Sequence, residues 1–300
     1  MKRPLVLSLV PMLFAAAPAL AHDGAHDGGP GWTLDLWVTA PLLLTALLYG
    51  AGFFRLWKRS VQGRPSLKRG GALFAAGWWT LAAAVVSPLH AAGERSFTMH
   101  MIEHEVIMLV AALLLVAARP GPVLLWAFPV RARQALAGLG RAGWAVSLWR
   151  ALTNPVAATA LQGLAMWVWH VPSLFDRALA SEGWHIAQHL SFLVTALLFW
   201  WAMAHGRGGR YSYGTSALCL FVTSLIGGAL GALMSFSTSP WYRGYAALGM
   251  TPIGLTPVED QQLAGLLMWI PGGLVHAGAA LFFLYKWLKA SEARHAVPAE

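Results

Sequence analysis

Charged residues and cysteine are both scarce in this sequence of 300 residues. Charged residues make up 11% of the chain and hydrophobic residues 57%, whereas a soluble domain is about one quarter charged. In lipid, every backbone N–H and C=O must be bonded inside a helix or a closed barrel. The short segments of alternating polarity that build a barrel do not occur in the sequence. The composition therefore predicts an all-α fold, a polytopic transmembrane helical bundle.

The single cysteine, Cys219, restricts the chemistry of any metal site. One thiol allows no internal disulfide and no cysteine-based metal motif. Any metal must therefore be held by His, Met, Asp or Glu side chains. The net charge of +9 does not indicate a nucleic-acid partner, because the basic residues are scattered in short loops and do not form one basic face.

We divide the chain into four parts. Residues 1–21 have the features of a secretory signal peptide, with Lys2 and Arg3 before an apolar stretch and a small-x-small ending at Ala21. Cleavage there leaves His22 at the N-terminus, and an uncleaved signal anchor is the alternative. The remaining parts are a His/Gly-rich periplasmic lead at 22–33, a seven-helix membrane domain at 34–289 and a cytoplasmic tail at 290–300.

Seven apolar runs approach the roughly 20 residues that a helix needs to cross a bilayer. We place them at 34–57, 70–89, 98–118, 153–173, 184–204, 214–236 and 260–287. Lys and Arg are concentrated in alternate loops, and such loops remain cytoplasmic. This pattern predicts a multi-pass protein of the bacterial cell (inner) membrane, with the mature N-terminus outside and the C-terminus inside. The arginine-containing loop at 130–151 predicts a helix lying in the interface, and Gly227 with Gly231 predicts close helix packing.

Histidines gather on the predicted outer side of the membrane. His100 and His104 open the third run, and His185 and His189 open the fifth. Rings four residues apart project from one face of a helix, with Cβ atoms about 5–6 Å apart. His170 ends the fourth run at the same membrane level. A lone pair with this spacing is more often no site, but five outer histidines in lipid predict a metal site because buried polar groups usually face a site or cavity.

The ligand types favour copper over other metals. Imidazole suits copper and zinc, and thioether sulfur adds a preference for Cu(I). Thioether sulfur is available from Met99, Met101, Met166 or Met234. Copper, as Cu(I) or Cu(II), is therefore the first expectation and zinc the second. In the N-terminal lead, His22 and His26 either chelate copper in an ordered way or gather metal only loosely.

Two acidic residues near the histidines, and two residues deeper in the predicted membrane, have alternative roles that the sequence leaves open. Glu103 and Glu105 either orient the imidazoles from behind or lie solvated at the interface. Met268 and His276 are eight residues apart in the seventh run, hence roughly on one helix face. They form either a deeper ligand position or an ordinary part of the core.

Four segments of the chain resemble a known family. They are MHMIEHEVIML at 99–109, WHVPSLFDRAL at 169–179, WHIAQHLSFLVTALLFWW at 184–201 and DQQLAGLLMWIPGG at 260–273. Together they resemble the CtaG family of cytochrome c oxidase assembly factors, which is associated with caa-type oxidases. The resemblance implies a membrane protein that helps copper reach the CuB centre of oxidase subunit I. Carried over to this sequence, it favours as functional residues His100, His104, His170, His185, His189 and Asp260.

We therefore expect a copper-binding assembly factor that catalyses no covalent reaction. Its expected partners are cytochrome c oxidase subunit I, periplasmic copper chaperones and membrane lipid. One alternative is a copper transporter, which would need ionisable residues across the membrane. Another is a haem-binding membrane protein, because histidines on neighbouring helices can be axial ligands. A purely structural assembly scaffold would keep its function without the outer histidines.

Overall fold

The computed structural model describes residues 31–206 and 213–295. In this part of the chain every regular element is a helix, as the composition predicted. The elements are α1 (Leu36–Arg59), α2 (Arg64–Val86), α3 (Pro88–Gly93), α4 (Phe97–Glu105), the π-helical turn η1 (Val106–Ala111), α5 (Ala112–Ala118), α6 (Gly121–Leu125), α7 (Val130–Leu139), α8 (Gly143–Leu152), α9 (Pro155–Trp169), α10 (Pro172–Ala180), α11 (Glu182–His205), α12 (Tyr213–Phe236), α13 (Arg243–Leu248) and α14 (Pro257–His295). The predicted signal peptide lies outside the described residues, and so do His22 and His26 of the lead.

Five helices in the described ranges are long and apolar enough to cross a membrane. They are Leu36–Arg59, Phe97–Ala118, Glu182–His205, Tyr213–Ser235 and Pro257–Glu292. The other two predicted runs correspond to α2, which begins among charged residues, and to α9, which has 15 residues. Seven crossings therefore remain a prediction. The second run ends earlier than expected, at Val86, because the Ser87 side chain caps a separate short helix.

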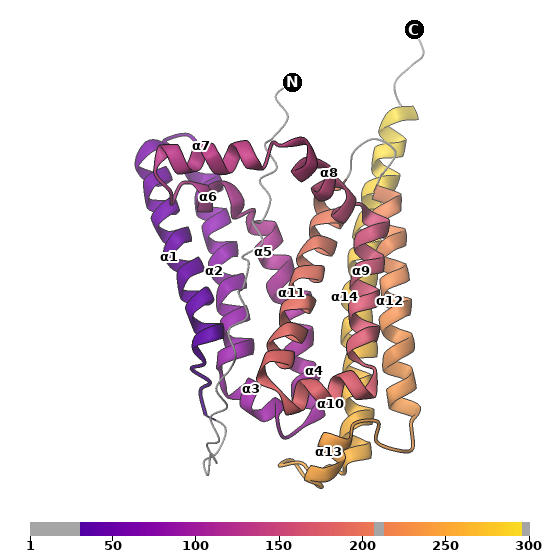
Figure 1. The fold of residues 1–300 in the computed structure, drawn as a ribbon. Helices are drawn as coiled ribbons and strands as arrows, with labels where there is room; N and C mark the ends of the chain where they lie inside the picture. The colour runs from indigo at the N-terminus through magenta and orange to yellow at the C-terminus, as the bar shows by residue number, and fades with distance from the viewer. Residues whose placement is uncertain (1–30, 207–212, 296–300) are drawn as a thin grey trace.

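The long helices run side by side and the short helices cover the two ends (Figure 1). The continuous α4–η1–α5 segment and α11 lie in the middle of the bundle. Helices α1 and α2 flank them on one side, and α9, α12 and α14 on the other. The predicted interfacial helix is a pair, α7 and α8, at the end of the bundle near α6. Helices α3, α10 and α13 lie at the opposite end, where the site is found.

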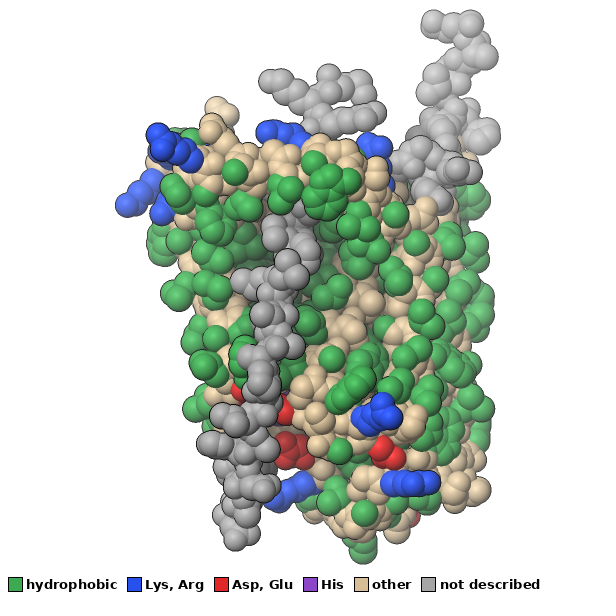
Figure 2. All heavy atoms as spheres, in the orientation of Figure 1, with side chains coloured by type: hydrophobic (Ala, Val, Ile, Leu, Met, Phe, Trp, Pro, Cys, Tyr) green, Lys and Arg blue, Asp and Glu red, His purple; other side chains and the backbone are tan. Residues whose placement is uncertain are grey.

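The flank of the bundle is apolar. Figure 2 shows hydrophobic side chains over its middle, with Lys and Arg side chains toward the two ends. Large side chains such as Leu43, Leu47 and Phe54 are exposed there. An apolar surface of this extent needs a nonpolar solvent, because soluble monomers rarely expose such large patches. The surface therefore agrees with a helical membrane bundle.

Close packing between α12 and α14 depends on two glycines. A Cβ atom on Gly231 would lie 2.6 Å from the carbonyl oxygen of Gly265, and one on Gly265 would lie 2.5 Å from that of Gly231. Gly227 instead faces Met166 at an ordinary contact distance of 3.7 Å. The close approach predicted from the glycine spacing is thus confirmed at Gly231, where two backbones meet.

The start of α4 is bonded to the first turn of α14. The buried carboxylate of Asp260 accepts hydrogen bonds from Ser96 Oγ at 2.8 Å, Phe97 N at 2.6 Å and Thr98 N at 3.2 Å. Backbone N–H groups in the first turn of a helix have no partner within the helix. Asp260 supplies partners for two of them and so fixes where the helix carrying His100 and His104 begins.

Candidate metal centre

Five histidines from three helices meet at the end of the bundle near α10 and α13. Their rings come from α3, α4 and α11: His90, His100, His104, His185 and His189. The two pairs predicted from sequence do face each other, with the ring centroids of His104 and His189 4.9 Å apart and those of His100 and His185 5.2 Å apart. We call these five residues the histidine cluster.

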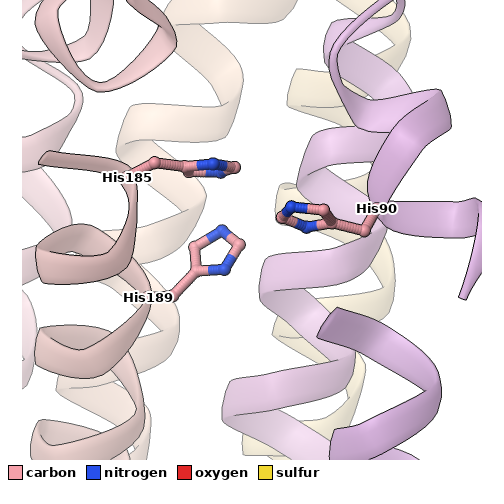
Figure 3. Close-up of side chains that lie close together, drawn as sticks. All are labelled: His90, His185 and His189. Carbon is pink, nitrogen blue, oxygen red and sulfur yellow. The ribbon is translucent and has the colours of Figure 1, made fainter. Parts of the chain in front are cut away.

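The first trio in the cluster is His90, His185 and His189. One ring nitrogen from each lies within 4.8 Å of the others. Figure 3 shows the ring of His90 reaching from α3 toward the two rings of α11. The rings of His90 and His185 are stacked with centroids 5.1 Å apart. All three residues are half-buried, so this trio lies at the more accessible part of the cluster.

The second trio is His100, His104 and His189. Its ring nitrogens also lie within 4.8 Å of one another, but His100 and His104 are fully buried. The rings of His100 and His104 project from one face of α4, with centroids 4.4 Å apart. His189 belongs to both trios. The cluster therefore offers two neighbouring three-histidine positions that share one ligand.

The buried carboxylate of Glu103 orients two of the rings. Its Oε1 atom lies 2.8 Å from His90 Nδ1 and 3.4 Å from His189 Nδ1. An ionised carboxylate only accepts hydrogen bonds, so Nδ1 of His90, which is hydrogen-bonded to it, carries the hydrogen. In the neutral ring this leaves the lone pair on Nε2, the arrangement found behind many metal-binding histidines. Glu103 is thus buried and in contact with two rings of the cluster, and its role behind metal-binding histidines stays a prediction.

Tyr245 of α13 orients the ring of His100 by a hydrogen bond to its Nδ1 atom. The Tyr245 hydroxyl donates to the carbonyl oxygen of Gly93 at 2.6 Å and lies 3.0 Å from His100 Nδ1. Because the hydroxyl hydrogen is directed to Gly93, His100 Nδ1 must be the donor in the second bond. The lone pair of His100 is therefore on Nε2. Burial also raises the pKa of Tyr245 well above its usual value, which keeps this hydroxyl protonated.

The charge of Glu103 acts on His90, which lies outside the membrane-spanning helices. Burial lowers the pKa of His90, but the hydrogen bond and the negative charge of Glu103 raise it, and the net pKa lies above the usual value. Glu103 thus favours a positive charge at this ring. A metal cation bound at Nε2 would supply that charge in place of the proton.

Comparison with known proteins identifies the family. The model of the cytochrome c oxidase caa3 assembly factor family (Caa3_CtaG) matches residues 47–290. The chain belongs to this family. The matched range includes the whole histidine cluster together with Glu103, Tyr245 and Asp260, so the site lies inside the assembly-factor domain.

Two mycobacterial proteins are similar to this chain. They are the uncharacterized proteins Mb0105 of Mycobacterium bovis and MT0111 of Mycobacterium tuberculosis, each 28% identical over 250 residues. The similar region covers 79% of this chain but 36% of each relative. The chain thus spans about a third of the length of these relatives. No solved structure matches it.

The remaining predicted ligands of this CtaG-family chain lie apart from the two trios. His170 is buried near the cluster, and its Nδ1 lies 2.6 Å from the Met166 carbonyl oxygen, which leaves the lone pair on a buried, unpartnered Nε2. Met101 is buried in the hydrophobic core, and Met99 is half-buried. Asp260 binds the start of α4. Their roles as metal ligands stay predictions.

Two further residues of the site were not among the ligands predicted from sequence. His90 has no partner at helical spacing in the sequence, and its contact with α11 depends on how α3 packs. Its position just after the second run, at the same membrane level as the two histidine pairs, was the available signal. Tyr245 had no such signal, since nothing in its local sequence indicates a contact with His100.

The donor set fits a metal cation. Buried ring nitrogens without a hydrogen-bond partner are present on four members of the cluster: His100, His104, His185 and His189. An unmet buried polar atom costs about 1–3 kcal/mol. A soft or borderline cation would bind these nitrogens and remove the cost, and imidazole suits copper and zinc.

Proposed function

We propose that this assembly factor binds copper at the histidine cluster and delivers it to the CuB centre of cytochrome c oxidase subunit I. The observation that carries the proposal is the convergence of ring nitrogens in two trios, with buried Nε2 atoms that have no other partner. The membership of the chain in an oxidase assembly family supports the choice of client. Copper is the cargo in this reaction, and zinc is the competing metal.

Copper would move by exchange of ligands, without a covalent step. An ion that passes from the second trio to the first keeps His189 bound while two other histidines are exchanged. The second trio is buried and the first is half-buried, so this exchange carries the ion toward the surface. A half-buried position suits transfer to a partner protein, because its ligands are reachable. Periplasmic copper chaperones are the proposed source of the metal.

The proposed orientation puts the histidine cluster at the outer face of a bacterial cell membrane. The arginines of the 130–151 segment lie on α7, on α8 or in the turn between them, at the opposite end from the cluster. Loops rich in Arg remain on the cytoplasmic side. The cluster would then open to the periplasm, and the end of α14 would lie in the cytoplasm.

The test is oxidase maturation in cells that produce the chain with both His100→Ala and His104→Ala. The expected result is a client oxidase that contains haem but has lost CuB, measured as copper per haem in the purified enzyme. A matched strain with His205→Ala, at the other end of α11, should make normal oxidase. Full copper content in the double variant, at equal amounts of the factor in the membrane, would refute the proposal.

A further inference from the structure

A second group of possible metal ligands surrounds a small cavity deeper in the bundle. The cavity has a volume of about 20 Å³ and lies between the α4–η1–α5 segment, α9, α12 and α14. This volume is enough for one water-sized occupant. Besides the hydroxyl groups of Thr223 and Ser224, the lining side chains with lone pairs are Glu105, Met108, Gln162, Met166, Met268 and His276. None of these residues belongs to the histidine cluster.

Glu105 faces this cavity although Glu103 faces the cluster. A Cβ atom on Gly272 of α14 would lie 2.9 Å from Glu105 Oε2, so a larger residue there would force the carboxylate to shift. Oε2 is buried and has no hydrogen-bond partner among the described residues. Gln162 Oε1, in the same lining, is also buried and without a partner. Two oxygen acceptors are therefore unsatisfied in one small space.

The hydrogen-bond donors in the cavity lining are bonded to acceptors other than Glu105 Oε2 and Gln162 Oε1. The hydroxyl of Thr223 donates to Cys219 O at 2.9 Å, and Gln162 Nε2 donates to Met108 Sδ at 3.2 Å. His276 Nδ1 lies 2.8 Å from Gly272 O, and since a carbonyl only accepts, Nδ1 carries the hydrogen. The lone pair of the neutral His276 ring is then on Nε2. The lining thus presents mainly lone pairs, which is the requirement for binding a cation.

The π-helical turn holds one wall of this cavity in place. η1 contains Met108, and the indole nitrogen of Trp200 on α11 donates to the Met108 carbonyl oxygen at 2.9 Å. The Trp200 ring is stacked on the His276 ring, with centroids 5.8 Å apart and planes 3° apart. π-helical turns inside α-helices are frequent at functional sites. Trp200 therefore fixes both a methionine and the histidine of the lining.

The ligand set selects the cation. A single carboxylate balances one positive charge, and an unbalanced charge is costly inside a membrane. Three thioether sulfurs and an imidazole are soft or borderline ligands, which favour Cu(I) over the oxygen-seeking alkali and alkaline-earth cations. Met108 keeps a free sulfur lone pair while it accepts from Gln162. We infer that this cavity is a second, intramembrane site for Cu(I), held by Met108, Met166 and Met268 with the charge of Glu105.

This inference has its own ligands and does not depend on the histidine cluster. The two sites can therefore be separated by the atoms that bind copper, sulfur in the cavity and nitrogen in the cluster. X-ray absorption at the copper edge distinguishes these neighbours. The full chain would be purified in detergent and loaded with Cu(I) alone under a reductant and without oxygen.

The unmodified chain should show copper–sulfur scattering together with copper–nitrogen scattering. A variant with Met108→Leu, Met166→Leu and Met268→Leu keeps nearly the same side-chain volume. It should lose the sulfur neighbours and one copper equivalent while keeping the nitrogen-bound copper. Met203→Leu and Met234→Leu, two buried methionines outside the lining, are the matched controls. The variant with His100→Ala and His104→Ala should keep the sulfur-bound copper. Loss of copper from the histidine cluster and loss of copper from the cavity can therefore be told apart.

Glu105→Gln provides a test that leaves the packing nearly unchanged. Loss of the charge should weaken Cu(I) binding at the cavity by about tenfold or more, the effect seen for groups that support a metal site. The affinity is measured by competition with a coloured Cu(I) chelator. Absence of copper–sulfur scattering in the unmodified chain would overturn the inference, and so would an unchanged copper equivalent in the folded triple variant or unchanged affinity in Glu105→Gln.

Discussion

His90 Nδ1 and Glu103 Oε1 lie 2.8 Å apart and connect α3 to α4. The same carboxylate oxygen lies 3.4 Å from Nδ1 of His189 on α11. One buried side chain therefore sets the ring orientation of histidines on two other helices. This relationship ties the geometry of the first trio to a carboxylate that belongs to neither trio.

Glu103→Gln should weaken copper binding without removing a ligand. The amide can still accept one hydrogen bond, but it loses the charge that holds Nδ1–H on His90 and that faces the ring of His189. Loss of such a supporting group lowers metal affinity by about 10–100-fold. Competition with a coloured copper chelator measures the change. Glu259→Gln, an exposed acid at the same end of the bundle, is the control and should leave the affinity unchanged. Equal affinities for both variants would mean that Glu103 does not support the site.

Single alanine replacements should rank the histidines by the number of trios to which they belong. His90→Ala changes only the first trio and His104→Ala only the second, whereas His189→Ala changes both. We expect His189→Ala to cause the largest loss of copper affinity, at least equal to the two other losses combined. Titration of copper into each purified variant measures this order. A smaller effect of His189→Ala than of His90→Ala would show that the trios are not the binding positions.

Asp260→Asn should lower stability more than it lowers copper affinity. The carboxylate accepts three hydrogen bonds from the start of α4, and an amide cannot accept them all. Hydrogen bonds to charged groups contribute about 1.5–3 kcal/mol each, so the thermal midpoint in detergent should fall clearly. Glu259→Gln, at the exposed neighbouring position, should cause a small shift. If Asp260→Asn instead kept its midpoint and lost copper, Asp260 would belong to the metal site.

Gly231→Ala should force α12 and α14 apart. The added Cβ atom would lie 2.6 Å from Gly265 O and 2.9 Å from Trp269 N, which are backbone atoms and cannot turn away. Overpacking of this kind costs about 1–3 kcal/mol, measured as a lower midpoint of thermal unfolding. Gly278→Ala on α14 meets nothing within 4 Å and should be neutral or slightly stabilising. A harmless Gly231→Ala would contradict the close backbone contact.

The long helices could be predicted from sequence because lipid leaves the backbone few alternatives. Uniformly apolar runs gave most long helices to within a few residues. The exceptions are α2, which begins in charged sequence and ends at Val86, and α14, which continues beyond the predicted end of its run to His295. The short helices at the ends, α3, α10 and α13, were not predicted, since helices this brief have weak local signals. The count of crossings also rests on length and composition alone.

The histidine pairs were predictable from their spacing, but their neighbours were not. Spacing along one helix fixes which side chains share a face, whereas contacts between helices depend on packing order. Glu103 and Glu105 looked equivalent in sequence, yet residues two apart on a helix lie about 200° apart around its axis. Glu103 therefore faces the cluster and Glu105 the cavity. His90 joined the site through a contact between α3 and α11 that no local pattern indicates.

Elemental analysis of the purified chain, combined with X-ray absorption at the copper edge to identify the atoms bound to copper, tests the central claim most directly. The chain would be produced in copper-supplied cells, purified in detergent and compared with a variant in which all five members of the histidine cluster are alanine. The account predicts copper in the unmodified chain, bound through nitrogen, and loss of that nitrogen-bound copper in the variant. Equal nitrogen-bound copper in both proteins, zinc in place of copper, or iron with the absorption spectrum of haem would contradict it.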